Sequence, residues 1–298
     1  MKPLVSVVIA TYRREDSLKK AIESIVNQTY KEYEIILVDD NANEEWNKKV
    51  AVIVNDFQKK FPDINIQYIV NESNLGSAKT RNIGIVKSQG NYVTFLDDDD
   101  LYLPNKIERQ ITFMENGNYD YSITDLNLYN ENDKLIDKRV RNYIKDIAPD
   151  SLLGYHLKYH LTGTDAMMFR KEYLVNIGGF APIDIGDEFY LMQRAINGNG
   201  KFGYLPQSDI KAYIHTGCGG LSSGEGKIKG ENDLYEYKKK YFNNLSAQDI
   251  RYIKMRHYAV LAFAYLRMKK FGSAIKNGGL SFFAAPVYFC KLLLQMKF

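Results

Sequence analysis

Four adjacent aspartates, Asp97, Asp98, Asp99 and Asp100, directly follow a strand-forming run at 92–96. Adjacent carboxylates repel one another, so such a run needs either full exposure to water or a cation among its oxygens. Mg²⁺ and Mn²⁺ prefer carboxylate oxygens and often join a protein to a diphosphate through one or two of them. We therefore predict a divalent metal site here. A solvated acidic turn is the alternative.

Polar side chains follow two other expected strands in the same way. Thr11, Tyr12 and Arg13 come after the run at 4–10, and Asp39 and Asp40 come after the run at 34–38. Ligands of open parallel sheets bind beyond the carboxyl ends of the strands, so we expect all three groups to open onto one crevice. A carboxylate at 39–40 could accept hydrogen bonds from a nucleobase or a ribose. It could equally cap the helix that starts near Glu44.

Three further places carry candidate functional groups. Arg81 lies near the start of an expected helix, where a phosphate would be favoured, although a solvated basic face is the alternative. Asp187 and Glu188 begin another helix, where a carboxylate can act as general base or simply complement the helix dipole. His215 ends a strand before a glycine-rich loop, and is either a third metal ligand or a structural histidine.

The elements that must position these residues alternate between strand and helix. Strand runs at 4–10, 34–38, 66–70 and 92–96 are separated by amphipathic segments, which predicts an α/β fold with a mostly parallel, Rossmann-like sheet flanked by helices. Residues 119–215 are mixed, with strand-like segments at 119–128 and 164–170. Residues 216–230 are rich in glycine and serine, which predicts a loop able to close over a ligand. Beyond residue 232 the pattern is helical.

The charge distribution separates a body from a tail. The whole chain of 298 residues has a net charge of +4, yet residues 250–298 hold nine Lys or Arg and no Asp or Glu. An apolar, basic segment of this kind is typical of a helix that lies in a membrane interface. No run reaches the roughly 18 apolar residues of a spanning helix. Two distant cysteines, Cys218 and Cys290, fit a reducing compartment.

Taken together, six stretches resemble the family 2 glycosyltransferases of GT-A fold, which build bacterial surface polysaccharides. The resemblance covers about residues 3–220 and rests on the segments VSVVIATYRRED, IVNQTY, EIILVDDNANEE, NLGSAKTRNIGI, YVTFLDDDD and IGGF. It implies a nucleotide-sugar donor, usually a UDP-sugar, a Mn²⁺ or Mg²⁺ ion and inversion at the anomeric carbon. The acceptor would be a hydroxyl of a glycan or a lipid-linked glycan.

The resemblance also implies roles for individual residues. Asp97, Asp98 and Asp99 cover the family's DXD motif, in which Asp99 would hold the metal and Asp97 would assist at the sugar or ribose. The nucleotide would contact the segment Thr11, Tyr12 and Arg13, the base-reading acid Asp40 with Asp39, and the diphosphate-binding Arg81.

The identity of the general base stays open at this point. The family usually has Glu-Asp before its Leu-x-x-Arg pattern, with the second acid as base, whereas this chain has Asp187-Glu188. Register from Leu191 and Arg194 places Glu188 at the base position.

These inferences define the expected organisation. Residues 1–230 would form the catalytic domain, with a nucleotide-binding half at 1–118 and an acceptor half at 119–230, followed by a helical extension at 231–298. The protein is expected in the cytoplasm at the inner face of the membrane, which it would contact through 271–298. A helical cap is the alternative role for that tail. No nucleic acid partner is expected, and a homodimer is left open.

Two other function classes compete with this one. A sugar-phosphate nucleotidyltransferase also uses an α/β domain and Mg²⁺, but the segment VIATYRRED lacks the glycine that a triphosphate loop needs. A glycan- or membrane-binding scaffold would keep the fold without the chemistry. The acids at each expected position argue against it.

Overall fold

The computed structural model describes residues 2–183, 186–214 and 224–295. The chain forms two compact units. We call Met1–Leu152 with Leu161–His215 the sheet unit, and Leu153–His160 with Thr216–Phe298 the helical unit. The predicted division into a catalytic domain at 1–230 and an extension at 231–298 stays a prediction.

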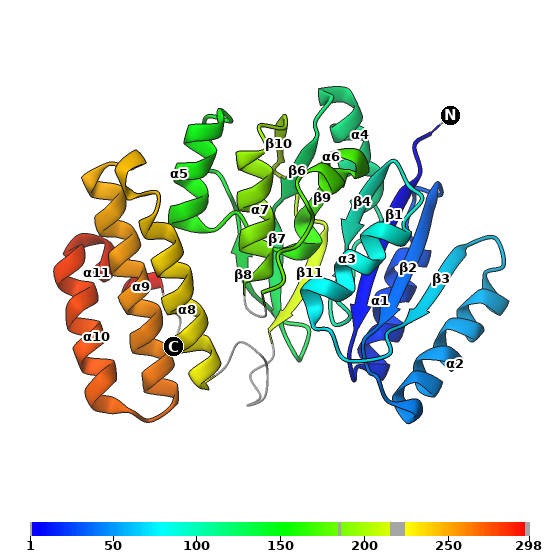
Figure 1. Cartoon of the computed structure of the whole chain (residues 1–298), viewed down its shortest axis with the longest axis horizontal. Helices are drawn as coiled ribbons and strands as arrows, with labels where there is room; N and C mark the ends of the chain where they lie inside the picture. The colour runs from blue at the N-terminus through cyan, green and yellow to red at the C-terminus, as the bar shows by residue number, and fades with distance from the viewer. Residues whose placement is uncertain (1, 184–185, 215–223, 296–298) are drawn as a thin grey trace. The chain divides into compact units, whose positions relative to one another are not determined.

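A seven-stranded sheet is the centre of the sheet unit (Figure 1). Its strand order is β10-β6-β9-β4-β1-β2-β3, and β9 is antiparallel to both of its neighbours whereas the other neighbouring strands run parallel. The strands are β1 (Val5–Thr11), β2 (Tyr33–Asp39), β3 (Asn65–Val70), β4 (Tyr92–Phe95), β6 (Tyr121–Thr124), β9 (Met167–Arg170) and β10 (Phe202–Leu205). The predicted mixed α/β fold is confirmed.

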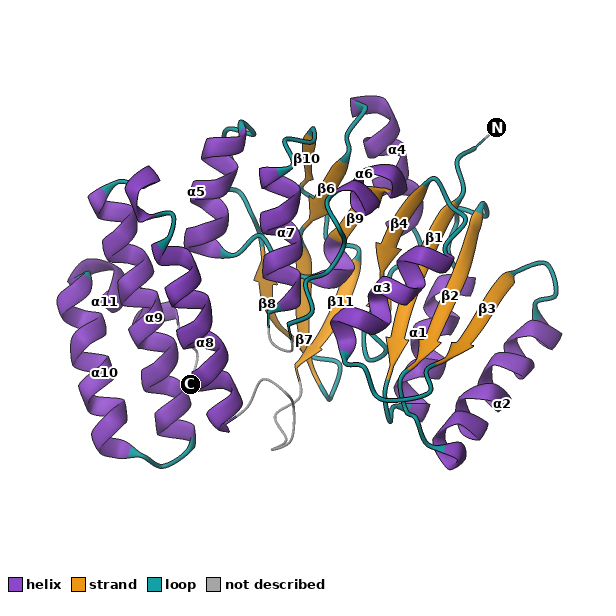
Figure 2. Ribbon diagram, viewed as in Figure 1, coloured by secondary structure: helices purple, strands orange, loops and turns teal. Residues whose placement is uncertain are grey.

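Helices cover both faces of this sheet. Because parallel crossovers are right-handed, α1 (Glu15–Val26) and α2 (Glu44–Lys60) lie on one face and α3 (Ser77–Lys87) lies on the other (Figure 2). The inner strands β1 and β2 are therefore buried almost throughout, as their continuous apolar runs predict. The remaining helices of this unit are α4 (Lys106–Gly117), α6 (Lys171–Asn176), α7 (Asp187–Asn197) and the first part of α5 (Pro149–Tyr159).

A second, four-stranded sheet has the order β5-β11-β7-β8. Its strands are β5 (Leu101–Tyr102), β7 (Leu126–Asn130), β8 (Leu135–Arg139) and β11 (Ile210–Ile214). The single strand expected at 119–128 is wrong, because the chain turns at Asp125 and places β6 and β7 in different sheets. Both halves are rich in strand formers, so the sequence pattern does not reveal the turn.

Two other segments differ from expectation. The strand expected at 164–170 starts with a 3₁₀ turn, Thr164–Ala166, before β9. The loop expected at 216–230 ends early, because α8 (Gly224–Lys239) begins at Gly224. The rest of that loop lies outside the described residues, so closure over a ligand stays a prediction.

The helical unit consists of the end of α5, α8, a 3₁₀ turn (Phe242–Asn244) and three further helices: α9 (Ala247–Arg267), α10 (Phe271–Ala284) and α11 (Pro286–Gln295). Its interior holds polar pairs as well as apolar residues. His257 Nδ1 lies 3.1 Å from Glu231 Oε1, and Ser281 Oγ donates to the Met255 carbonyl at 2.7 Å. The last bond fixes α10 against α9.

Candidate active site

Asp98 joins the ends of β1 and β4. Its Oδ2 accepts hydrogen bonds from Thr11 Oγ1 at 2.8 Å and from the Tyr12 amide at 3.2 Å. Burial, together with the neighbouring charge of Asp99, raises the pKa of Asp98 to about 7. The acidic run is therefore not a solvated turn, since this aspartate is buried and bonded to a neighbouring strand end.

Asp97, Asp100 and Asp165 each place a carboxylate oxygen within 4.8 Å of the other two. Asp165 comes from the 3₁₀ turn before β9, and its Oδ1 accepts the Asp97 amide at 2.7 Å. Burial and then the charge of the neighbouring carboxylates raise the pKa of both Asp100 and Asp165. Three clustered carboxylates are a donor set that suits a hard divalent cation. The predicted metal site at Asp97 thus has a chemically fitting environment.

Asp99 lies outside that cluster and pairs instead with Arg14, the residue preceding α1. Arg14 Nε also lies 3.7 Å from Asp98 Oδ1, so one guanidinium offsets the charge of two aspartates. The role of Asp99 as metal ligand stays a prediction. His215, the third expected ligand, lies outside the described residues.

Arg81 on α3 joins two carboxylates that are far apart in sequence. Its Nη2 lies 2.6 Å from Asp97 Oδ1 and its Nη1 lies 2.7 Å from Asp187 Oδ2. The Arg81 side chain is only 11% exposed, and its guanidinium lies over the Phe180 ring at 5.4 Å. One side chain therefore links the acidic run after β4 to the start of α7.

Replacing Arg81 by glutamine is expected to lower the free energy of unfolding by about 2–3 kcal/mol, because two carboxylates lose their shared cation. The value lies at the low end for a buried pair since Asp97 is 34% exposed. Urea unfolding followed by circular dichroism measures it. Arg109→Gln is the control: it breaks an Arg–Asp pair whose arginine is 46% exposed and should cost less than about 1 kcal/mol. Equal losses in the two variants would contradict the bridging role.

Glu188 and Asp187 lie side by side at the start of α7 but differ in their partners. Asp187 accepts hydrogen bonds from Arg81, from Ser77 Oγ at 3.1 Å and from the Glu188 amide at 2.9 Å. Glu188 Oε2 accepts one from Thr164 Oγ1 at 3.1 Å. Burial and then the charge of Asp187 raise the pKa of Glu188, which favours it as a group that accepts a proton.

Asp40 is engaged with the segment that leads into α3. Its carboxylate accepts from the Leu75 amide at 2.8 Å, the Gly76 amide at 2.9 Å and Asn71 Nδ2 at 2.8 Å. Gly76, with φ of 80°, directly precedes α3. Asp40 thus fixes the entry to the helix that carries Arg81. Its expected contact with a nucleobase stays a prediction.

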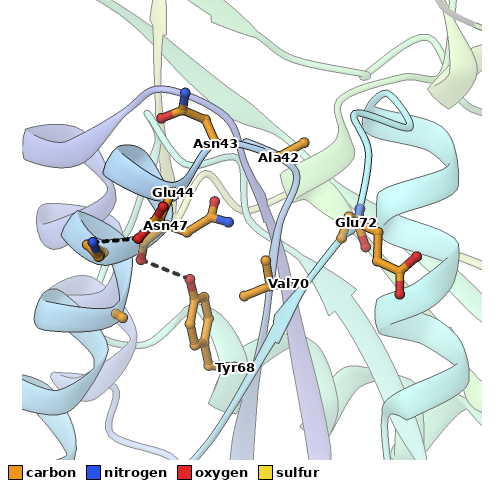
Figure 3. A pocket seen from close by; sticks show the side chains of 10 residues that line it. Ala42, Asn43, Glu44, Asn47, Tyr68, Val70 and Glu72 are labelled. Carbon is orange, nitrogen blue, oxygen red and sulfur yellow. Dashed lines mark hydrogen bonds and ion pairs between the residues drawn. The ribbon is translucent and has the colours of Figure 1, made fainter.

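A cavity of about 620 Å³ lies between β3 and the start of α2 (Figure 3). Asp39 Oδ2 accepts from the Tyr68 hydroxyl at 2.7 Å and Oδ1 accepts from the Asn41 amide at 2.9 Å. Tyr68 and Asn71 belong to the cavity lining, so both Asp39 and Asp40 bond directly to residues of its wall. Its other lining residues are Ala42, Asn43, Glu44, Asn47, Lys48, Ala51, Val70 and Glu72.

The segment after β1 presents Tyr12 and Arg13 to solvent. Tyr12 is 43% exposed, and the Arg13 guanidinium lies 5.0 Å from its ring centre. Arg13 has φ of 54°, and its amide donates to Asn41 Oδ1 at 2.7 Å. The three expected strand-end groups are therefore connected, since this bond joins the end of β1 to the end of β2 and Asp98 joins β1 to β4.

Residues 6–178 match the protein family described as "Glycosyl transferase family 2". This chain belongs to that family. A glycosyltransferase is a transferase, so membership supports the predicted enzyme class, and the GT-A architecture is confirmed by similar solved structures.

Two curated glycosyltransferases illustrate the range of similarity. The uncharacterized glycosyltransferase MJ1057 of Methanocaldococcus jannaschii is 32% identical over an alignment 310 positions long, which covers 99% of this chain and 94% of that protein. The Escherichia coli enzyme WfgD, named as a UDP-Glc:alpha-D-GlcNAc-diphosphoundecaprenol beta-1,3-glucosyltransferase, is 30% identical over 43% of this chain and 48% of its own length. Other relatives are longer, and the match spans as little as 18% of one of them.

Among solved structures, the mannosyltransferase PcManGT from Pyrobaculum calidifontis, in complex with GDP-Man and Mn²⁺, has a TM-score of 0.62. The likeness covers 99% of this chain and 79% of that one, at 14% identity. At that identity the likeness shows the fold.

Sequence reasoning missed two residues of this site, Asp165 and Arg14. Asp165 lies within a run that was expected to be plain strand, and the preceding Gly163-Thr164 pair was the available signal of a turn. Arg14 was one of two adjacent arginines after β1. Its pairing with Asp99 and Asp98 distinguishes it from Arg13.

Proposed function

We propose that this protein transfers a sugar, with inversion, from a UDP-sugar to a hydroxyl of a glycan or lipid-linked glycan in surface polysaccharide synthesis. The observation that carries the proposal is the Arg81 bridge between Asp97, in the DXD segment, and Asp187, beside the candidate base. This bridge places the DXD segment, which is suited to a metal and a diphosphate, in one site with Glu188, which is suited to accept a proton. The name of WfgD, which includes a UDP-sugar and a diphosphate-linked lipid acceptor, agrees with this reaction.

The chain's residues divide the reaction between them. Glu188 takes the proton of the acceptor hydroxyl as that oxygen forms its bond to the anomeric carbon. The bond from that carbon to the diphosphate breaks, and its electron pair leaves on the diphosphate oxygen. Arg81 turns from its two carboxylates to that diphosphate, where its charge stabilises the departing group.

Asp99 and Asp97 are the residues we assign to the divalent metal. When bound, Mn²⁺ or Mg²⁺ supplies positive charge at the diphosphate. In this assignment Asp100 and Asp165 position the acidic segment that follows β4. Asp165 accepts a hydrogen bond from the Asp97 amide, and Asp100 Oδ1 accepts one from the Tyr213 amide at 2.8 Å. Arg14 is the cation that pairs with Asp99 in this structure.

We place the nucleobase at the ends of β1 to β3, between Tyr12 and the walls held by Asp39 and Asp40. The exposed ring of Tyr12 offers a stacking surface, and the nearby cavity of about 620 Å³ leaves room at this edge of the sheet. The acceptor then approaches from the Glu188 side.

Release of nucleotide from a panel of UDP- and GDP-sugars tests the proposed function. We expect UDP release that needs Mn²⁺ and stops with EDTA, because the carboxylates alone would repel the diphosphate. A nucleotidyltransferase would instead release diphosphate from a nucleoside triphosphate and a sugar 1-phosphate. A scaffold without chemistry would release nothing with any donor.

The tail beyond α9 supports the membrane part of the proposal. The most exposed apolar side chains on α10 and α11 are Phe271, at 60%, Ile275, at 77%, Phe283, at 81%, Val287, at 67%, and Leu294, at 86%. Lys276 and Lys291 lie on the same two helices, which carry no acidic residue. None of the described helices is long and apolar enough to cross a bilayer. We propose that these two helices lie on the inner face of the cell membrane.

Co-sedimentation with phosphatidylcholine vesicles, with and without phosphatidylglycerol, checks this surface. We expect binding that requires the anionic lipid and weakens with salt. Ile275→Asp with Phe283→Asp should reduce it by about tenfold or more, because two apolar contacts are lost and two negative charges are added.

Val86→Asp on α3 is the control, since that valine is 75% exposed in the sheet unit. Truncation before α10 is less informative, because it would remove Ser281 and expose the face of α9 to which Ser281 bonds. Equal sedimentation of the double variant and the control would leave α10 and α11 as a packing or dimerisation element.

A further inference from the structure

The edge of the second sheet carries an excess of positive charge. β8 is the outermost strand of that sheet, and all five of its residues are exposed. The segment 134–145 contains five cations and a single acid, Asp137. Arg141 is buried and bonds to the Thr124 and Thr162 carbonyls, but Lys134, Lys138, Arg139 and Lys145 are exposed.

Register places Arg139 on the side of this sheet that faces the candidate base. Arg139 pairs with Leu126 in the antiparallel ladder, so the two side chains point to the same face. Leu126 packs on Gly163, because its Cδ2 would lie 2.6 Å from a Cβ placed there. The next residue, Thr164, donates to Glu188. Arg139 is thus three contacts away from the residue assigned to take the acceptor's proton.

The Arg139 guanidinium forms no ion pair within the described part of the chain, whereas Arg81 is already shared by two carboxylates. Its positive charge reaches Glu188: burial and Asp187 raise the pKa of Glu188, and Arg139 opposes that rise. Because Arg139 is exposed, keeping its charge without an ion pair costs little desolvation. It remains available to a ligand.

We propose that Arg139 binds an oxyanion, a phosphate or a carboxylate, on the acceptor, so that the acceptor is a negatively charged glycan. This inference rests on the proposed function, because it takes Glu188 as the base and so fixes the side from which the acceptor enters. A guanidinium presents two parallel N–H groups to such an anion, which gives orientation as well as affinity. Arg139 is then a specificity-determining residue. It holds the acceptor while Glu188 accepts the hydroxyl proton.

Three sugars that differ only at carbon 6 test the inference: glucose, glucuronate and glucose 6-phosphate. Binding to the full chain is measured by saturation-transfer NMR with UDP and Mg²⁺ present to occupy the donor site, because paramagnetic Mn²⁺ would broaden the sugar signals. We expect at least one charged sugar to bind and glucose to bind more weakly, with the difference shrinking as salt rises. The stronger of the two charged sugars identifies the anion as carboxylate or phosphate.

Arg139→Gln should weaken binding of the charged sugar by about tenfold or more, the usual loss for a hydrogen bond to a charged group, and leave glucose binding alone. Arg139→Lys should recover part of the loss. Lys138→Gln removes one charge from the neighbouring position, which points to the opposite face of the strand, and should change little. Equal binding of all three sugars, or equal loss in the Arg139→Gln and Lys138→Gln variants, would overturn the assignment.

The same samples separate this inference from the proposed function. Mn²⁺-dependent release of UDP by the unaltered protein reports on the donor reaction. Where that release occurs and charged sugars are not preferred, the acceptor inference alone fails. Where no donor is turned over, the proposed function fails, whatever the sugar-binding result.

Discussion

Replacing Glu188 by glutamine is expected to slow sugar transfer by about 10²- to 10⁴-fold while leaving nucleotide affinity unchanged. Glutamine keeps the shape and can still accept the Thr164 hydrogen bond, but it cannot take a proton. The loss should fall on kcat rather than on the donor KM. Single-turnover transfer and calorimetric titration of UDP with Mn²⁺ measure the two quantities.

The pH dependence of sugar transfer is a second test of Glu188 as the general base. A general base works only when deprotonated, so activity of the unaltered protein should fall as pH drops through the raised pKa of Glu188. The acidic limb of the kcat profile should be absent from the residual activity of Glu188→Gln.

Asp187→Asn is the matched control, because Asp187 is the adjacent acid but already accepts from Arg81, Ser77 and the Glu188 amide. We expect it to loosen Arg81 and therefore to change nucleotide affinity and stability together with rate. A larger fall in kcat for Asp187→Asn, with unchanged nucleotide affinity, would make Asp187 the base and assign Glu188 a structural part.

Replacing Asp99 by asparagine is expected to weaken Mn²⁺-dependent nucleotide binding by about 100-fold or more, since a metal is worth several kcal/mol at the charge it stabilises. The fold should hold, because the lost pair with Arg14 is partly exposed, with Arg14 38% accessible. Affinity for UDP with and without Mn²⁺, and thermal unfolding of the same samples, are the measurements.

Asp165→Asn tests whether the metal lies instead among Asp97, Asp100 and Asp165. Asparagine can still accept the Asp97 amide through its carbonyl oxygen, so the segment after β4 should keep its position. We expect Mn²⁺ affinity to change by only a few-fold. If instead Asp165→Asn abolishes the Mn²⁺ effect and Asp99→Asn preserves it, the ion lies among Asp97, Asp100 and Asp165 and the DXD assignment of Asp99 is wrong.

Much of this enzyme could be predicted from local patterns. The apolar runs that become β1, β2 and β4 are continuous because these strands are covered on both faces, and that requirement is visible within seven residues. The strand ends then followed from a general rule of parallel sheets, which brought Thr11, Asp40 and Asp97 to one edge. Family membership followed from the same segments in order.

Other features depend on which distant segments meet, and no local pattern encodes that. The run at 119–128 looks like one strand, yet it divides between two sheets, because its first half pairs with β9 and its second half pairs with β11. Arg14 and Arg13 are chemically alike. The approach of β4 decides that Arg14 pairs with Asp99 while Arg13 faces solvent.

The candidate site itself shows the same division. The sequence determined which residue types stand at the strand ends, because burial and periodicity act over a few neighbours. Only the tertiary structure brought Asp165 to the amide of Asp97, Arg81 to Asp187 and Leu126 of β7 to Gly163, across separations of 68 and 106 residues for the first two. A carboxylate accepts any nearby donor or cation, so its partner is selected by the packing of whole elements and not by its own sequence neighbours.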